Sequence, residues 1–110
     1  MKKLFGEVQI TKGEYPDSCC SYIELEYYKI KKRNRKRSTL REKTSFYGIE
    51  IVKKEIEGKK KNVEKERIEY ITSDENNIHQ MLYTFRDNLV TPMGLQESVE
   101  EFSKKELLKN

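Results

Sequence analysis

The residues with side chains suited to acid–base chemistry or metal binding are few in this chain. His79 is the single histidine, and Cys19 and Cys20 are adjacent and are the only cysteines. A structural zinc site needs about four such ligands, and a catalytic histidine needs a nucleophile or an orienting carboxylate beside it. Neither grouping surrounds these residues in the sequence. They therefore predict a solvent-facing helix residue at position 79 and two reduced thiols near the start of a strand.

Sequence motifs for phosphate and calcium binding are also missing. The five glycines are dispersed, and none forms a glycine-rich phosphate loop ending in lysine. Paired acids such as Glu24 with Glu26 and Glu100 with Glu101 are typical of hydrated surfaces, and their spacing is not that of a calcium loop. We therefore expect a protein that is not an enzyme and that has no metal site and no cofactor.

The basic stretch Lys29–Lys43 is the strongest binding signal. It holds nine Lys or Arg residues and one acid, so it carries a net charge of +8 while the rest of the chain carries −4. Such a cluster is suited to phosphates, with an affinity that falls as salt rises, and it also attracts acidic proteins. A solvated loop without a ligand is equally compatible with this composition. The candidate binding residues are Lys31, Lys32, Arg33, Arg35, Lys36, Arg37 and Arg41.

Tyrosines are the other side chains near the basic stretch that are able to bind a ligand. Tyr27 and Tyr28 are consecutive in a predicted strand, so one of them must face solvent. An exposed tyrosine beside basic residues can stack on nucleic-acid bases. Ordinary strand propensity with a satisfied hydroxyl explains the same residues, and we favour this second interpretation.

The elements that position the basic stretch are predicted to be strands. Charged residues make up 38% of the chain, but the apolar residues fall in periodic blocks, which argues against disorder. Aromatic and β-branched residues alternate with polar ones in three segments, Tyr22–Ile30, Thr44–Lys54 and Glu66–Thr72, and more weakly in Leu4–Thr11. In the third segment, the alternation places Ile68 and Tyr70 on one face.

The connections between these strands predict hairpins. Residues 31–43 are expected to form a mobile hairpin loop, and Glu55–Lys65 is expected to form a second loop. Successive loops of a meander alternate between the two ends of the sheet, and a ten-residue strand spans about 33 Å. The basic stretch and the lysines of Lys59–Lys61 are therefore expected at opposite ends, where they cannot form one basic surface.

The last third of the chain changes to a helical period. A helix is predicted from about Asp74 to Asn88 or Leu89 with Ser73 as its N-cap, and a second helix is predicted to begin at Thr91-Pro92. The apolar stripe of the first is Ile78, Met81, Leu82, Phe85 and Leu89, and the inner face of the second is Leu95, Val99 and Phe102.

These elements predict an α+β fold in a single domain spanning residues 1–110. A three- or four-stranded antiparallel meander is followed by two helices packed on one face, because no other element is available to cover the sheet. The opposite face is expected to be wet, with glutamates at alternate positions. No apolar run approaches the roughly 18 residues of a membrane span, and no apolar core follows the basic start, so we expect a cytoplasmic protein without a membrane partner.

Several structural motifs occur together between Tyr22 and Phe102. The segments are Tyr22–Tyr28, Tyr47–Val52, Ile68, Ile71–Asp74, Asn88–Pro92, Leu95, Val99, Glu100, Glu101 and Phe102. In this combination the chain resembles a family of short uncharacterised proteins of Gram-positive anaerobic bacteria. The resemblance implies a cytoplasmic bacterial protein with no assigned activity and no functional residues to transfer. It also implies that a connection as long and basic as residues 29–43 departs from the family.

A complete small fold without a catalytic grouping predicts a non-enzymatic protein-interaction module, regulatory in role, whose partner is another protein. The wet sheet face and the acidic second helix are its expected surfaces. The alternative is a nucleic-acid-binding protein that uses the basic hairpin loop Lys29–Lys43.

Overall fold

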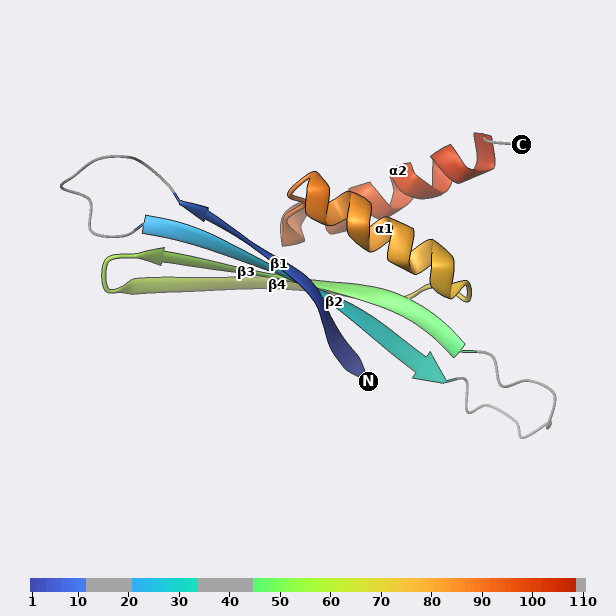
Figure 1. Ribbon diagram of the computed structural model, residues 1–110, viewed down its shortest axis with the longest axis horizontal. Coiled ribbons are helices and arrows are strands. Elements are labelled where there is room, and N and C mark those ends of the chain that lie inside the picture. Colours follow the sequence, from blue (N-terminus) through green and yellow to red (C-terminus); the bar gives the residue numbers. More distant parts are fainter. Residues whose placement is uncertain (12–20, 34–44, 109–110) are drawn as a thin grey trace.

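Four antiparallel strands form one sheet in the order β1-β2-β3-β4, and two helices follow them in the chain (Figure 1). The computed structural model describes residues 1–11, 21–33 and 45–108. The predicted α+β fold, a meander followed by two helices, is confirmed. The elements are β1 (Lys2–Thr11), β2 (Ser21–Arg33), β3 (Ser45–Glu57), β4 (Lys60–Thr72), α1 (Glu75–Asp87), the 3-10 turn η1 (Pro92–Gly94) and α2 (Leu95–Leu108).

The hairpin between β3 and β4 is much tighter than the sequence predicts. The strands continue to Glu57 and from Lys60, so the expected loop over Glu55–Lys65 is wrong. Gly58 adopts φ +62 in the turn, a conformation that glycine reaches at little cost. The first eight residues of β4 are all exposed, so no apolar alternation marks them as a strand. Pairing with β3 holds them in the sheet instead.

The register of the strands sets the two ends of the molecule. Arg33 of β2 pairs with Ser45 at one end of β3, whereas Ser21 pairs with Glu57 at the other end. The structure measures 62 Å along its longest axis, and Figure 1 shows the β3–β4 turn at the end opposite to the last residues of β2 and the first residues of β3. The prediction that the basic stretch and the Lys59–Lys61 segment lie at opposite ends is therefore confirmed for the strand ends that bound them.

Both helices lie over the middle of one sheet face, as Figure 1 shows, and we call the other side the open face. The core forms where the apolar stripe of α1 packs on the sheet face that the helices cover. Burial of each such side chain contributes roughly 1.5–3 kcal/mol. The core residues are Leu25, Tyr27, Tyr47, Ile49, Ile51, Ile78, Met81, Leu82, Phe85 and Leu95. Val99 and Phe102 of α2 pack against this cluster, as predicted.

The boundaries of α1 differ slightly from the prediction. Asp74, and not Ser73, is the N-cap, and its carboxylate accepts hydrogen bonds from the backbone N–H groups of Asn76 and Asn77. A carboxylate at this position satisfies free N–H groups and also interacts favourably with the helix dipole. At the other end, Leu89 lies beyond the helix with φ +55 and is exposed, so it is not part of the apolar stripe.

The connection from α1 to α2 is fastened to the sheet by Tyr27. Its hydroxyl donates a 2.8 Å hydrogen bond to the carbonyl of Val90, and burial raises the pKa of Tyr27 to about 12. Thr91 makes no side-chain capping bond, and Pro92 opens a 3-10 turn before α2 begins at Leu95. Among the helices that the structure describes, neither is long and apolar enough to span a membrane.

Candidate functional site

The predicted binding residues are located at the end of β2 and beyond it. Lys31, Lys32 and Arg33 are the last residues of β2 and lie opposite the first three residues of β3. Lys31 and Arg33 are exposed, and within the described residues neither forms an ion pair. Residues 31–33 are therefore strand and do not belong to a hairpin loop. Four predicted residues lie outside the described part of the chain, namely Arg35, Lys36, Arg37 and Arg41.

A row of three side chains crosses the open face at this end of the sheet. Lys32 of β2 lies directly opposite Phe46 of β3, and the Phe46 ring meets that of Tyr70 from β4 at a centroid distance of 5.8 Å in an edge-to-face arrangement. Tyr70 is 64% exposed. The Lys32 ammonium also forms a 3.0 Å ion pair with the carboxylate of Glu69 on β4. A cation and an accessible aromatic ring thus lie on the same face with Phe46 between them, at the end of β2.

A β-bulge at Gly48 is responsible for the position of this ring. The register of β3 and β4 shifts here, so that residues 69–71 of β4 lie opposite Gly48 alone. A Cβ atom at position 48 would lie 2.1 Å from the carbonyl oxygen of Ile68 and 2.5 Å from that of Glu69. Only glycine permits this approach, and the extra residues of a bulge re-aim the side chains that follow it.

The bulge overturns one prediction about β4. Ile68 packs against the core, but Tyr70 contacts Phe46, which alternates with the buried Tyr47 and so belongs to the open face. Ile68 and Tyr70 therefore do not share a face. Simple alternation fails because it assumes a regular strand. The one sequence signal of the irregularity is a glycine in the middle of the strand Ser45–Glu57.

The tyrosines considered for stacking next to the basic stretch are not available for it. Tyr27 is fully buried and its hydroxyl is bonded to the backbone. Tyr28 is half-buried on the open face, where the Lys2 ammonium lies 4.5 Å from its ring centroid and its hydroxyl donates to Glu26. The accessible ring near the basic residues comes instead from Tyr70, which is 37 residues beyond Arg33 in the chain.

Lys29, the first residue of the basic stretch, makes its contacts with other residues of this protein. Its ammonium donates to the carboxylate of Glu75 and lies 2.9 Å from Nε2 of His79 and 5.2 Å from the ring centroid of Tyr47. Because an ammonium only donates, Nε2 of His79 is the acceptor in this contact. The hydrogen bond from Lys29 lowers the pKa of Glu75. The prediction that His79 faces solvent is therefore wrong, and this cluster fastens β2 to α1.

The open face carries acids that are less exposed than predicted. Glu50 is almost fully buried, and its carboxylate accepts from Lys2 at 2.7 Å and from Arg67 at 2.9 Å. Burial by itself raises the pKa of Glu50, but the two hydrogen bonds outweigh this and leave the pKa below its ordinary value. Glu26 is similarly covered and contacts Lys54. The long basic side chains fold over these two glutamates, so ion pairs cover this part of the face that was expected to be wet.

Three acids come together on the open face where β1 pairs with β2. Oxygen atoms of Glu7, Glu24 and Glu26 lie within 4.8 Å of one another, because Glu7 pairs directly with Glu26. One of the three, Glu26, is already shared with Lys54 and with the Tyr28 hydroxyl. The trio resembles a hydrated acidic surface more than a metal centre.

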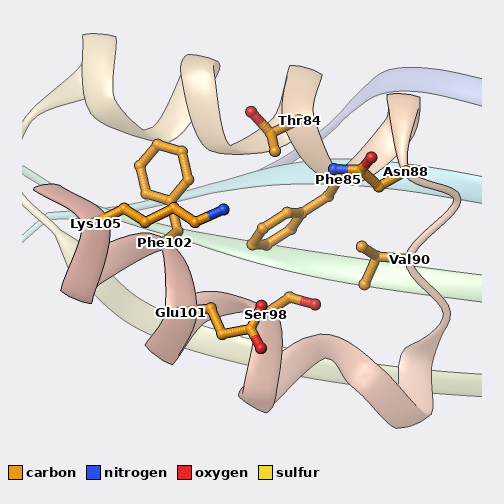
Figure 2. Close-up of a pocket in the computed structure, with 8 residues that line it drawn as sticks. All are labelled: Thr84, Phe85, Asn88, Val90, Ser98, Glu101, Phe102 and Lys105. Carbon is orange, nitrogen blue, oxygen red and sulfur yellow. The ribbon is translucent and has the colours of Figure 1, made fainter.

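A groove lies between α1 and α2. Its volume is about 460 Å³, and Figure 2 shows the rings of Phe85 and Phe102 at its centre with polar side chains around them. The lining residues are Thr84, Phe85, Asn88, Val90, Ser98, Glu101, Phe102 and Lys105. The exposed acids of α2, Glu97, Glu100 and Glu101, adjoin it, as the sequence predicted for this helix.

Comparisons with known proteins give a family but no activity. No curated protein and no solved structure matches the chain. One family model matches residues 2–105 and therefore includes all four strands, α1 and most of α2. It also includes the basic stretch. The chain belongs to DUF6514, a family of unknown function.

Proposed function

We propose that this protein is a non-enzymatic binding protein that binds nucleic acid through the end of the sheet where the basic stretch joins it. The observation that carries the proposal is the strand end Lys31–Arg33, which presents two exposed cations, Lys31 and Arg33, with no ion pair among the described residues. Residues 34–44 add a further net charge of +4 by sequence. Concentrated, uncompensated positive charge favours phosphate backbones.

Elsewhere in the chain, acidic residues outnumber basic ones. Glu50 offsets Lys2 and Arg67, Glu26 offsets Lys54, and the net charge outside residues 29–43 is negative. A polyanion is therefore attracted to one end of the molecule and not to its whole surface. We place this activity in the cytoplasm of a Gram-positive anaerobic bacterium, the setting that the sequence resemblance implies.

Binding to a labelled oligonucleotide, followed by fluorescence anisotropy over a salt series, tests the proposal. With about five phosphate contacts, the affinity is expected to fall roughly 100-fold between about 50 and about 200 mM salt. Absence of binding at low salt, or an affinity that does not change with salt concentration, contradicts the proposal. Polyglutamate serves as competitor: if it displaces the oligonucleotide at equal charge concentration, the ligand is an acidic protein surface instead.

A protein partner is the second candidate, and the groove between α1 and α2 favours it. The groove is lined by Phe102, which is half-buried, and by Phe85, which belongs to the core, and the exposed Glu101 of α2 borders it. Its complementary occupant is an amphipathic helix of another protein, with apolar residues for the rings and Lys or Arg residues for the acids. This candidate uses a different face of the molecule and does not compete with the basic end.

Site-specific photocrosslinking in cells tests the second candidate. A photoreactive residue at Ser98, within the groove, is expected to capture a peptide with apolar residues at helical spacing and basic residues beside them. The same residue at the exposed position Lys61, on the β3–β4 hairpin, is the control. Equal capture at both positions, or captured peptides without this pattern, contradicts the candidate.

A further inference from the structure

We propose that the aromatic pair Phe46–Tyr70, flanked by Lys32, stacks on an unpaired base, so that the protein prefers single-stranded over double-stranded nucleic acid. We call these three residues the aromatic platform. The inference rests on the proposed function and names the class of nucleic acid that is bound. It adds residues from β3 and β4 to a site that the sequence confined to residues 31–41.

The exposure of Tyr70 distinguishes it from the other aromatic residues. Among the described residues, Tyr70 and Tyr83 are the exposed aromatic side chains, at 64% and 52%. Tyr83 lies on α1, on the side of the sheet that the helices cover, against Phe5 and beside Arg86, whereas Lys32 lies on the open face. Tyr70 is supported from one side by the edge-to-face contact with Phe46, which orients the ring while leaving most of it accessible.

The position of the cation suits a nucleotide bound to this ring. Lys32 and Tyr70 lie on strands separated by β3, which places their backbones about 10 Å apart across the sheet. A nucleotide whose base stacks on Tyr70 can therefore direct a flanking phosphate toward Lys32. The Lys32 side chain is 38% exposed and its ammonium contacts Glu69 at the surface, so a phosphate can share the ammonium at little cost.

Stacking selects for unpaired bases. In a duplex, base faces are covered by neighbouring base pairs, so an exposed tyrosine gains nothing from it and only the phosphate contacts remain. In a single strand, every base has an accessible face, and stacking on an aromatic side chain adds to the electrostatic attraction without requiring a particular sequence. The backbone irregularity at Gly48 is consistent with this role, because it turns Tyr70 away from the core and toward the basic end.

Anisotropy measurements with three probes test the platform: a labelled single-stranded oligonucleotide, the same strand in a duplex, and an abasic strand of the same length. Replacing Tyr70→Ala is expected to lower the affinity for the normal single strand about tenfold. Affinities for the duplex and the abasic strand, and the salt dependence, should not change. The variant Tyr70→Phe keeps the ring and should bind like the wild type, as should the control Tyr83→Ala.

The outcomes separate this inference from the proposed function. Salt-sensitive binding that Tyr70→Ala leaves intact, or equal wild-type affinity for the normal and abasic strands, overturns the platform while the proposed function stands. Absence of wild-type binding to all three probes overturns both. Because Tyr70 is mostly exposed, the alanine variant is expected to fold, which a thermal melt followed by circular dichroism checks, and the phenylalanine variant supplies the matched comparison.

Discussion

Replacing Arg33, Arg35, Lys36 and Arg37 together with alanine is expected to weaken binding to a single-stranded oligonucleotide by about 100-fold or more at low salt. Each lost phosphate contact removes about 0.7 from the slope of log affinity against log salt, so the slope should fall by up to about 3. The cause is the loss of counterion release and not a change in fold, since Arg33 is exposed at the strand end. A salt series with both proteins measures the two effects.

The other end of the sheet offers a control that is matched in charge. Replacing Lys59, Lys60, Lys61 and Lys65 with alanine removes four positive charges as well, so both variants have the same formal net charge of zero. These lysines are exposed and belong to the β3–β4 hairpin. Lys59–Lys61 lie at the end opposite to Arg33, and Lys65 pairs with Val52 near the middle of β3. We expect this variant to retain most of its affinity. An equal loss in both variants would show that net charge alone drives binding and would contradict a localised site.

Replacing Gly48→Ala is expected to lower the free energy of unfolding by roughly 3 kcal/mol. The new Cβ atom would lie 2.1 Å from the carbonyl oxygen of Ile68, and that atom belongs to backbone paired in the sheet. Relief therefore requires β4 to move away from β3, which disrupts the bulge and the packing of Ile68 on the core. Urea denaturation followed by circular dichroism measures the change.

Gly94→Ala is the matched comparison for this prediction. Gly94 does not have a positive φ, and the nearest atom to its added Cβ would be Oγ1 of Thr91 at 4.0 Å. The same substitution at this position should be neutral or should stabilise the protein by up to about 1 kcal/mol, because alanine reduces the freedom of the unfolded chain. If the two variants are equally stable, the close approach at Gly48 is not what holds the bulge.

Several features of the fold follow directly from local patterns in the sequence. The alternation in Tyr22–Ile30 and Thr44–Lys54 identifies β2 and β3, and the stripe from Ile78 to Phe85 identifies α1. These patterns are reliable because one face of each element is buried. Apolar residues must therefore recur with the period at which side chains return to that face, two residues in a strand and about 3.6 in a helix. The first half of β4 has no buried face, so its sequence from Lys60 to Arg67 carries no such period.

For the candidate site too, some features follow from the sequence and others only from the tertiary structure. The sequence by itself determines where the positive charge lies along the chain and which strand ends bound it, because charge and hairpin order are local properties. Only the tertiary structure decides that Lys29 forms an ion pair with Glu75 and Lys32 with Glu69. It also decides that the Tyr70 ring packs against Phe46 on the face that carries Lys32. The ion pair of Lys29 joins β2 to α1, which are far apart in the sequence. The position of Tyr70 depends on the bulge in β4, which arises from the close approach of two strands, and the alternation within either strand does not encode that approach.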